Sequence, residues 1–522
     1  MQCINSLRLR SYLRPLCVGV STVLLSSCVL GPNYKIPPAV AEHALSSTQF
    51  YRANAQTTQP VSPINNWWEQ LNDPILSRLI NLSIAQNLSL QAAQARLDIS
   101  RAVMDQRSAE RMPSIGASAF YAETKAPDWI ADKLSQSTRE LAATLQHTAN
   151  PAAAQALGQG SGNAHSKWSS IYQLGFDAQW ELDIFGRRRR ALEQAQAQEQ
   201  ADAAGIADMQ VQLAAQIGTL YMNYRALQAR VQIANTHLKN IQDTLQLAQR
   251  QFKLGIGTEL DIARIETQVH QQEYMRLALT GGQTVLLDQL ALLVGQEPGS
   301  LDNMLASITP LPALPNSIAI GNPAELIQHR PDVREAEREL AASNAQIGQA
   351  MSAYFPQVSL IGSIGMLATS AKQLGSAALN EAVLPMLRWS AFDFGRTRAM
   401  VSQAKNGFRA REAAYKGTVL AALEDANASL TQFGIAREQY VSAQQIVDSA
   451  QHSDQLMQQR QRLGAATLMN TLDVQRQYLS AEDTLMQAKT QMLVDFISLQ
   501  KSLGLGWQTE SSPRLMSAAK SH

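Results

Sequence analysis

Hydrophobic and polar residues alternate along residues 172–183, "YQLGFDAQWELD". Aromatic and aliphatic side chains fall on one face of an extended chain, and Gln, Gly, Asp and Glu fall on the other. A period of two predicts a β-strand with one apolar and one polar face. A soluble sandwich strand has the same pattern as a barrel strand between lipid and a polar lumen. We predict strands at about 114–123, 171–183, 358–368 and 382–395.

Pro385 lies within the fourth of these segments and suggests a bend or a bulge there. Four strands cannot close a barrel, and a sheet with unpaired edges is not viable in lipid because its backbone groups would lack hydrogen bonds. If the strands span a membrane, the chain must therefore pool them with copies of itself. That gives eight strands in a dimer or twelve in a trimer.

Two long segments predict helices, from Arg187 to about Leu254 and from Arg396 to about Leu463. Both are rich in Ala, Gln and Leu and contain no proline. A continuous helix of this length would reach roughly 100 Å. A dimeric coiled-coil stalk is one interpretation. Apolar positions spread over more than one stripe, however, which favours helices packed on both sides in a wall.

Both long helices are predicted to end at a glycine-containing turn, "LGIGT" at 254–258 and "LGAAT" at 463–467. Glycine commonly follows the last helical residue, and threonine commonly caps the start of a helix. The residues in these two roles are Gly255 and Gly464, and Thr258 and Thr467.

The chain repeats itself. "WELDIFGR" at 180–187 returns as "WSAFDFGR" at 389–396, which is 209 positions later, and the offset holds without a gap through the helices that follow. Upstream the offset is 243, so the first copy carries 34 extra residues between Pro113 and Trp180. A period this long exceeds a solenoid unit and indicates a duplicated half-protein.

The N-terminus has the features of a secretory signal. Three arginines precede "LCVGVSTVLLSSC", an apolar run too short to span a bilayer but long enough for a signal sequence. Its end, "LSSC" at 25–28, resembles a bacterial lipobox, in which Cys28 would receive a covalent lipid. An ordinary signal peptide with a chance cysteine is the alternative. Val29 follows in place of the Asp that retains lipoproteins in the inner membrane, which implies sorting to the outer membrane.

Composition excludes several classes of protein. The 522 residues include 44 basic and 43 acidic ones, so no basic stripe is present and no nucleic-acid partner is expected. Cys3 and Cys17 lie in the signal, which leaves the mature chain without an intramolecular disulfide. The sequence has no phosphate-binding loop, HExxH or GxSxG motif, and its histidines are scattered. We predict no enzyme, no metal site and no cofactor other than the lipid on Cys28.

Several ordered blocks resemble one known family. They are "CVLGPNYKIP" after the lipobox, "WWEQLNDPILSRLI" at 67–80, the repeated junction phrase, "HRPDVREAERELAASNAQIGQAMSAYFPQVSL" at 329–360 and "TLDVQRQYLSAE" at 471–482. These blocks are similar to the outer-membrane efflux lipoproteins, the TolC-like outer-membrane factors of resistance-nodulation-division type tripartite drug pumps. The similarity runs from Cys28 to about Trp507.

The resemblance implies a membrane α+β fold. A homotrimer would form one 12-stranded outer-membrane β-barrel, four strands per chain, continued by a long periplasmic α-helical barrel. It also implies passive conduction from an inner-membrane pump through a periplasmic adaptor, the membrane fusion protein, with outer-membrane lipid around the barrel. Selectivity would follow pore width and charge. The barrel would meet the tunnel at Gly186, Arg187, Gly395 and Arg396.

In the family, inward acidic residues at the helix tips constrict the periplasmic end. Asp473 matches one such acid, Asn470 stands where relatives usually have another, and Asp261 is the half-repeat partner of Asn470. Asp473 and Asp261 could instead merely cap the returning helices. The tips, with Gly255, Thr258, Gly464 and Thr467, are also where the family meets its adaptor. The Tyr and Arg that often lock the tips fall on Gln461 and Ala466, so Arg264, Arg460 or Arg462 would have to substitute.

These observations divide the chain into consecutive segments. The extra loop at about 122–168 is either a helix capping the channel mouth or a surface insertion without a partner. The segments are a signal peptide (1–27), a lipidated extended segment (28–74), a first repeat (75–297), a Pro-rich connector (298–322), a second repeat (323–505) and a polar tail (506–522).

Two other functions stay open at this level. One is a TolC-like channel for type I protein or peptide secretion, and the lipobox together with residues 330–348 favours the drug-efflux branch over it. The other is a structural lipoprotein with a helical stalk and no pore.

Overall fold

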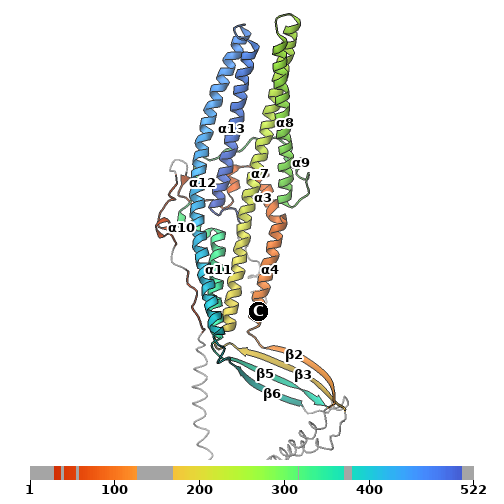
Figure 1. Cartoon of the computed structure of the whole chain (residues 1–522), viewed down its shortest axis with the longest axis vertical. Coiled ribbons are helices and arrows are strands. Elements are labelled where there is room, and N and C mark those ends of the chain that lie inside the picture. The colour runs from red at the N-terminus through yellow and green to blue at the C-terminus, as the bar shows by residue number, and fades with distance from the viewer. Residues whose placement is uncertain are drawn as a thin grey trace, which may run out of the picture. The chain divides into compact units, whose positions relative to one another are not determined.

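The computed structural model describes residues 29–36, 40–53, 58–125, 168–315, 317–368 and 379–507. The predicted signal peptide, Cys28, nearly all of the extra loop and the tail beyond Trp507 lie outside these residues. The chain divides into two compact units. A sheet unit contains Met104–Glu193, Ala345–Ala404 and the N-terminal stretch to Pro32, and a helical unit contains Asn33–Val103, Gln194–Asn344 and the chain from Lys405 onward (Figure 1).

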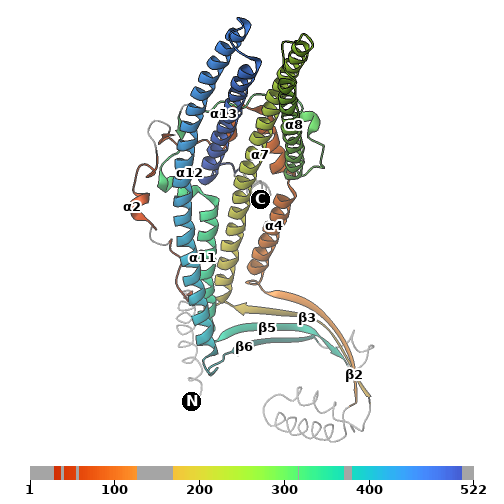
Figure 2. The ribbon, with the colours of Figure 1, turned by 45° about the horizontal axis from the view of Figure 1, so that its top comes forward.

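The sheet unit holds one four-stranded antiparallel sheet in the order β2-β3-β5-β6. In Figure 2 the four strands lie side by side, with β2 and β6 at the edges. Each half of the chain contributes a hairpin to it. The strands are β2 (Ser114–Lys125), β3 (Trp168–Leu182), β5 (Gln357–Ala368) and β6 (Leu379–Arg388).

The expected fourth strand was wrong at both ends and in its bulge. β6 ends at Arg388 instead of 395, and the last predicted residues lead into the start of α12 (Arg396–Arg462), where Asp393 accepts hydrogen bonds from the backbone of Gly395 (3.0 Å) and Thr397 (2.8 Å). Pro385 pairs with Leu360 in an unbroken register. β6 is an edge strand in the described sheet, a position where proline is tolerated.

Alternation along β3 gives the sheet two different faces, as predicted. Leu174 and Phe176 keep 51% and 59% of their surface exposed, and Ile115 keeps 75%. Cross-strand pairing places Gln179 beside Ser114 on the opposite face. One face of the sheet is therefore apolar, and its described side chains are exposed.

Two helical hairpins dominate the helical unit, although the first turns of their long helices belong to the sheet unit. The long helices each have 67 residues and end within one residue of the expected positions. The first hairpin is α7 (Arg187–Lys253) with α8 (Glu259–Val294), and the second is α12 (Arg396–Arg462) with α13 (Leu468–Ser502).

Shorter elements complete the fold. Strands β1 and β4 pair in parallel. Helices α4 and α11 lead into β2 and β5, so the two halves repeat one order of elements. The shorter elements are α2 (Glu42–Leu45), β1 (Thr58–Gln59), η1 (Trp67–Leu71), α3 (Pro74–Gln86), α4 (Leu88–Ala109), α9 (Asp302–Leu305), β4 (Ile318–Ala319), α10 (Pro323–His329) and α11 (Pro331–Ser352).

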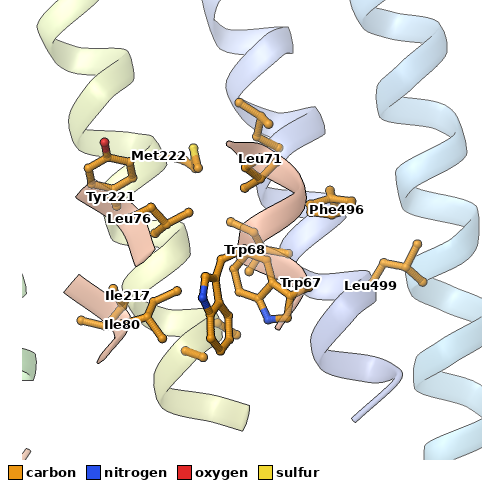
Figure 3. Close-up of a cluster of buried hydrophobic side chains, with 14 of the residues drawn as sticks. Trp67, Trp68, Leu71, Leu76, Ile80, Ile217, Tyr221, Met222, Phe496 and Leu499 are labelled. Carbon is orange, nitrogen blue, oxygen red and sulfur yellow. The ribbon is translucent and has the colours of Figure 1, made fainter. Parts of the chain in front are cut away.

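The main core forms where η1 and α3 pack among the long helices (Figure 3). Trp67 is fully buried and meets Trp68 and Phe496 edge to face, with ring centroids 5.6 and 6.2 Å away. Such pairs add about 0.5–1.5 kcal/mol beyond area burial. Gly218 of α7 allows this packing, because a β-carbon there would lie 2.7 Å from the Trp67 ring.

Candidate functional site: hairpin tips and strand-to-helix junctions

The tip of the first hairpin is built from a glycine turn and a capping box. Gly255 has φ +77°, and its N–H donates to the Phe252 carbonyl at 2.9 Å, which closes the end of α7. Thr258 then caps α8. Its hydroxyl accepts from the Asp261 N–H at 3.2 Å, and the Asp261 carboxylate accepts from the Thr258 N–H at 3.3 Å. Asp261 thus serves the cap, as the alternative interpretation expected.

The tip of the second hairpin repeats the turn but not the box. Gly464 has φ +72° and donates to the Gln461 carbonyl at 3.0 Å. Thr467 accepts from the Asn470 N–H at 3.3 Å. Asn470 occupies the position of Asp261, but no reciprocal bond from its side chain is found among the described residues. This tip therefore lacks the second bond that holds the first one.

Asp473 lies one turn further into α13 and takes no part in capping. Its carboxylate is 3.6 Å from the Arg476 guanidinium, and 56% of its side chain is exposed. In the described part of the chain, Arg264, Arg460 and Arg462 form no ion pair with it. Sequence reasoning missed Arg476, although its i, i+3 spacing from Asp473 was a usable signal.

Behind the tips the two hairpins share a small apolar cluster. Ile265 of α8 is fully buried, Leu472 of α13 is 2% exposed, and Ile241 of α7 packs with them. Leu472 is the neighbour of Asp473 along α13. Any movement of Asp473 by a shift of α13 therefore disturbs packing between the hairpins.

Polar contacts join α7 to α13 further along, in a group that we call the clamp (Arg230, His237, Tyr478, Glu482, Asp483). The Arg230 guanidinium pairs with the Asp483 carboxylate, and His237 Nε2 lies 3.3 Å from Glu482 Oε2. The hydrogen bond from His237 lowers the pKa of Glu482 despite burial. Burial, with a hydrogen bond to Glu482, raises the pKa of Tyr478 to about 12. Sequence reasoning found none of these residues.

The first junction, at Gly186 and Arg187, carries a network of ion pairs. Arg187 binds Glu181 through Nη2 at 2.7 Å and Nε at 3.0 Å. Arg188 reaches both Glu181 at 2.8 Å and Glu110 at 2.5 Å. Burial by itself would raise the pKa of Glu110. The hydrogen bond from Arg107 and the charges of Arg107 and Arg188 outweigh burial and lower this pKa. The strand end, the helix start and the turn before β2 are thereby fixed together.

The second junction, at Gly395 and Arg396, has no such network in the described residues. Asp393 binds the Thr397 hydroxyl and N–H, and these bonds lower its pKa. Phe394 adopts φ +53°, a left-handed conformation that is rare for bulky residues. Gly395 follows with φ +92°.

The first described residues of the chain are held at the first junction. Arg190 is 2% exposed, and it donates to the Leu30 carbonyl from Nε and to the Gly31 carbonyl from Nη2, both at 3.1 Å. Gly31 has φ +87°, and a β-carbon on it would lie 2.6 Å from Gly348 Cα. The chain just after Cys28 therefore has one fixed position in the sheet unit.

No group of three or more His, Cys, Asp or Glu side chains that could hold a metal occurs in the ranges that the structure describes. The described residues instead form long helical hairpins that end in capped turns, and a sheet with an apolar face. The profile of the family described as outer membrane efflux protein matches residues 79–296 and 322–505. The chain belongs to the outer membrane efflux protein family.

Other similarities agree with this assignment. The chain is 26% identical over 496 residues to the solvent efflux pump outer membrane protein SrpC of Pseudomonas putida, covering 94% of this chain and 98% of that protein. It is 27% identical to outer membrane protein OprJ of Pseudomonas aeruginosa, covering 94% and 96%. The solved outer-membrane channel OprN superposes with a TM-score of 0.76 at 32% identity, covering 92% of this chain and all of that one.

These similarities confirm the family resemblance that the sequence motifs indicated. This outer membrane efflux protein has the fold of TolC-like channels and is located in the outer membrane. Its work is efflux, and the family consists of channel and transport proteins.

Proposed function

We propose that this outer membrane efflux protein works as a homotrimer whose twelve strands close one barrel, continued by an α-helical tunnel into the periplasm. The observation that carries the proposal is the sheet of the sheet unit. It has an apolar face and two edge strands, β2 and β6, each with one neighbouring strand among the described residues. A sheet in lipid needs both edges paired, and copies of the same chain supply the missing strands.

Helix α8 supports the same arrangement. It contains a stretch that is long and apolar enough to cross a membrane by length and composition, yet only 17% of that stretch is buried. Leu277 and Leu292 are 62% and 72% exposed. In a ring of hairpins, neighbouring copies cover such a surface, and no membrane is needed to explain it.

We propose that the hairpin tips form the periplasmic gate. Asp473 is the charged gate residue, because its side chain is exposed and does not cap the helix. Asn470 lies one turn before it. Asp261 belongs to the gate through its cap, which fixes the shape of the first tip. The turns at Gly255, Thr258, Gly464 and Thr467 are the proposed contact for the periplasmic adaptor.

We further propose that Cys28 carries the lipid anchor. The docking of Leu30 and Gly31 at the start of α7 supports this, because it would hold an N-terminal lipid close to the end of the barrel strand β3. Loss of labelled palmitate incorporation in Cys28→Ser would test it. Retention of label in that variant would contradict it.

The cargo would be drugs or other small toxic molecules. The names of relatives refer to solvent, toluene and antibiotic efflux, which motivates this class. The chain would conduct passively and without catalysis, and an inner-membrane pump, reached through the adaptor, would supply the energy.

Single-channel conductance in planar bilayers tests the proposal. We expect a small, cation-favouring conductance for wild type, because acidic side chains at a constriction attract cations. Asp473→Ala should raise the conductance and weaken the cation preference, whereas Asp261→Ala should mainly destabilise the tip. A folded membrane protein with no conductance in any form would overturn the channel. If Asp473→Ala has the same conductance and cation preference as wild type, only the assignment of Asp473 to the gate is overturned.

A further inference from the structure

The two halves of the sheet unit repeat individual contacts. Trp180 Nε1 donates to the Arg111 carbonyl at 2.9 Å, and Trp389 Nε1 donates to the Tyr354 carbonyl at 3.1 Å. The tryptophans are 209 positions apart and the carbonyls 243 apart, which are the two offsets of the sequence repeat. The repeat therefore extends to the three-dimensional contacts.

Strand register obeys the same two offsets. Within the first half Ser114 of β2 pairs with Gln179 of β3. Adding 243 and 209 to these numbers gives Gln357 and Arg388, which pair between β5 and β6. The two hairpins are thus equivalent residue by residue.

In the sheet unit, the contact that joins the two halves has no second copy among the described residues. Where β3 meets β5, Ala178 pairs with Gly362, and beyond the strands the Phe185 ring stacks on Phe355 with centroids 4.8 Å apart at 25°. The equivalent of Phe185 is Phe394. Its ring stacks on no aromatic partner among the described residues, and it is fully exposed in the chain.

The equivalent of Phe355 is Met112, at the start of the opposite edge strand, and it is 69% exposed. Phe394 and Met112 lie at the two edges of the same sheet, so they cannot meet within one chain. The left-handed backbone of Phe394 is also strained, and the surrounding structure must compensate this strain. A ring held in this way on open surface needs a partner.

We propose that the contact between β3 and β5 is repeated between copies. Then β6 of one copy pairs with β2 of the next in a single antiparallel register, with Leu387 opposite Ala119, and Phe394 packs on Met112 of the next copy. These residues follow from Ala178, Gly362, Phe185 and Phe355 by the two offsets. An aromatic ring against a thioether is a favourable contact. The inference rests on the proposed trimer and specifies how its barrel closes.

Paired cysteines test the register. Cys28 is the mature chain's one cysteine, and a lipid on its sulfur leaves no free thiol in the background. Leu387→Cys is combined in turn with Ala117→Cys, Ala119→Cys and Tyr121→Cys, and mild oxidation is followed on non-reducing gels. Directly opposed residues lie about 4.5–5.5 Å apart and their diagonal neighbours about 7–8 Å, so only the opposed pair suits a disulfide. β2 and β6 of one chain are three strand spacings apart, roughly 14 Å, which excludes a bridge within the chain.

We expect covalent dimers and trimers when Leu387→Cys is combined with Ala119→Cys. Their yield should be at least about fivefold higher than with Ala117→Cys or Tyr121→Cys. Strongest bridging at position 117 or 121 would overturn the register and leave the trimer intact. If no pair bridges, native mass spectrometry separates the cases. A trimer without bridges would overturn pairing through these edges, and a monomer would overturn the proposed trimer itself.

A photoreactive side chain tests the aromatic contact. Phe394→p-benzoylphenylalanine should form a product between chains, and peptide mass spectrometry should place it at Met112. The matched control is Phe185→p-benzoylphenylalanine, which should react within its own chain at Phe355. Reaction of the position-394 probe only within its own chain or with lipid would overturn the contact between Phe394 and Met112.

Discussion

Arg230 of α7 and Asp483 of α13 form a two-point ion pair, with Nε to Oδ1 at 2.5 Å and Nη2 to Oδ2 at 3.1 Å. The side chains are 23% and 32% exposed. Paired geometry of this kind is both stronger and more specific than a single charge contact. It ties the first hairpin to the second, so it must break if the hairpins separate.

We therefore expect Arg230→Ala to favour the open channel. A partly exposed pair contributes about 1 kcal/mol, which corresponds to roughly fivefold in the ratio of open to closed states. Single-channel recording should show more frequent opening. Asp483→Ala should do the same, and the exchange Arg230→Asp with Asp483→Arg should restore wild-type behaviour. If the double variant with exchanged charges opens as often as the single variants, the ion pair does not hold the channel closed.

Asp73 should be the most sensitive polar residue of the core. It caps α3 through the N–H groups of Ile75 and Leu76, and it accepts the Tyr221 hydroxyl at 2.7 Å, while Arg225 donates to that hydroxyl. Burial and the bond to Asp73 raise the pKa of Tyr221. We expect Asp73→Ala to cost about 3 kcal/mol or more, from the lost cap and the unpaired buried partners.

Tyr221→Phe is the matched control for Asp73→Ala, since it removes the two hydrogen bonds of the Tyr221 hydroxyl and keeps the cap. It should cost about 1–2 kcal/mol. Chemical denaturation in detergent measures both variants. Similar losses in the two variants would contradict a separate contribution from the cap.

Gly31 should be intolerant of any side chain. Its β-carbon would lie 2.6 Å from backbone of Gly348, so Gly31→Val should release the N-terminal segment from the sheet unit. Hydrogen exchange of residues 29–36 should then rise. Gly299→Val is the control, because Gly299 also has positive φ, +84°, but a side chain there meets nothing within 4 Å. Equal exchange in wild type and Gly31→Val would show that the segment is not held by this contact.

Glu335 should make stability depend on pH. Burial, followed by the charges of Glu339 and Asp208, raises its pKa to about 6, above the ordinary 4.5. Between pH 4.5 and 6 the folded state holds the proton more firmly than the unfolded state, so this residue's contribution to stability falls as pH rises through that window. Above pH 6 the carboxylate is charged and the penalty is constant.

Glu335→Gln should therefore raise the Tm by a few degrees at pH 7.5 and leave it unchanged at pH 4. Scanning fluorimetry at both values measures this. Glu266→Gln, on the exposed surface of α8, is the control and should change the Tm little at either pH. A Tm gain for Glu335→Gln that is the same at pH 4 and pH 7.5 would point to a packing effect instead of charge.

Local features of the fold were predictable because local chemistry specifies them. The ends of α7 and α12 follow from Gly255 and Gly464, which take positive φ where few other residues can. The strand β3 follows from its alternation. The end of β6 was not predicted, because the apolar residues after Arg388 continue the pattern of a strand although they lead into α12, which Asp393 caps.

The roles of the site residues were harder to predict from the sequence. Asp261 and Asp473 are similar in sequence context, yet one closes a capping box and the other is exposed beside Arg476. Offset matching places Asp261 on Asn470 and Asp473 on Arg264, but it does not say which carboxylate closes a cap. Asn470 and Asp473 as gate residues, like the lipid on Cys28, stay predictions until tested.

The sequence by itself determined the repeat, the ends of the two long helices and the positions of the turns, because periodicity, glycine and capping residues act over a few neighbours. Only the tertiary structure decided which charges meet. Arg230 and Asp483 are 253 positions apart, and nothing local marks them as partners. Their pairing depends on how two hairpins pack, which is set by buried side chains such as Ile265 and Leu472 along the whole interface.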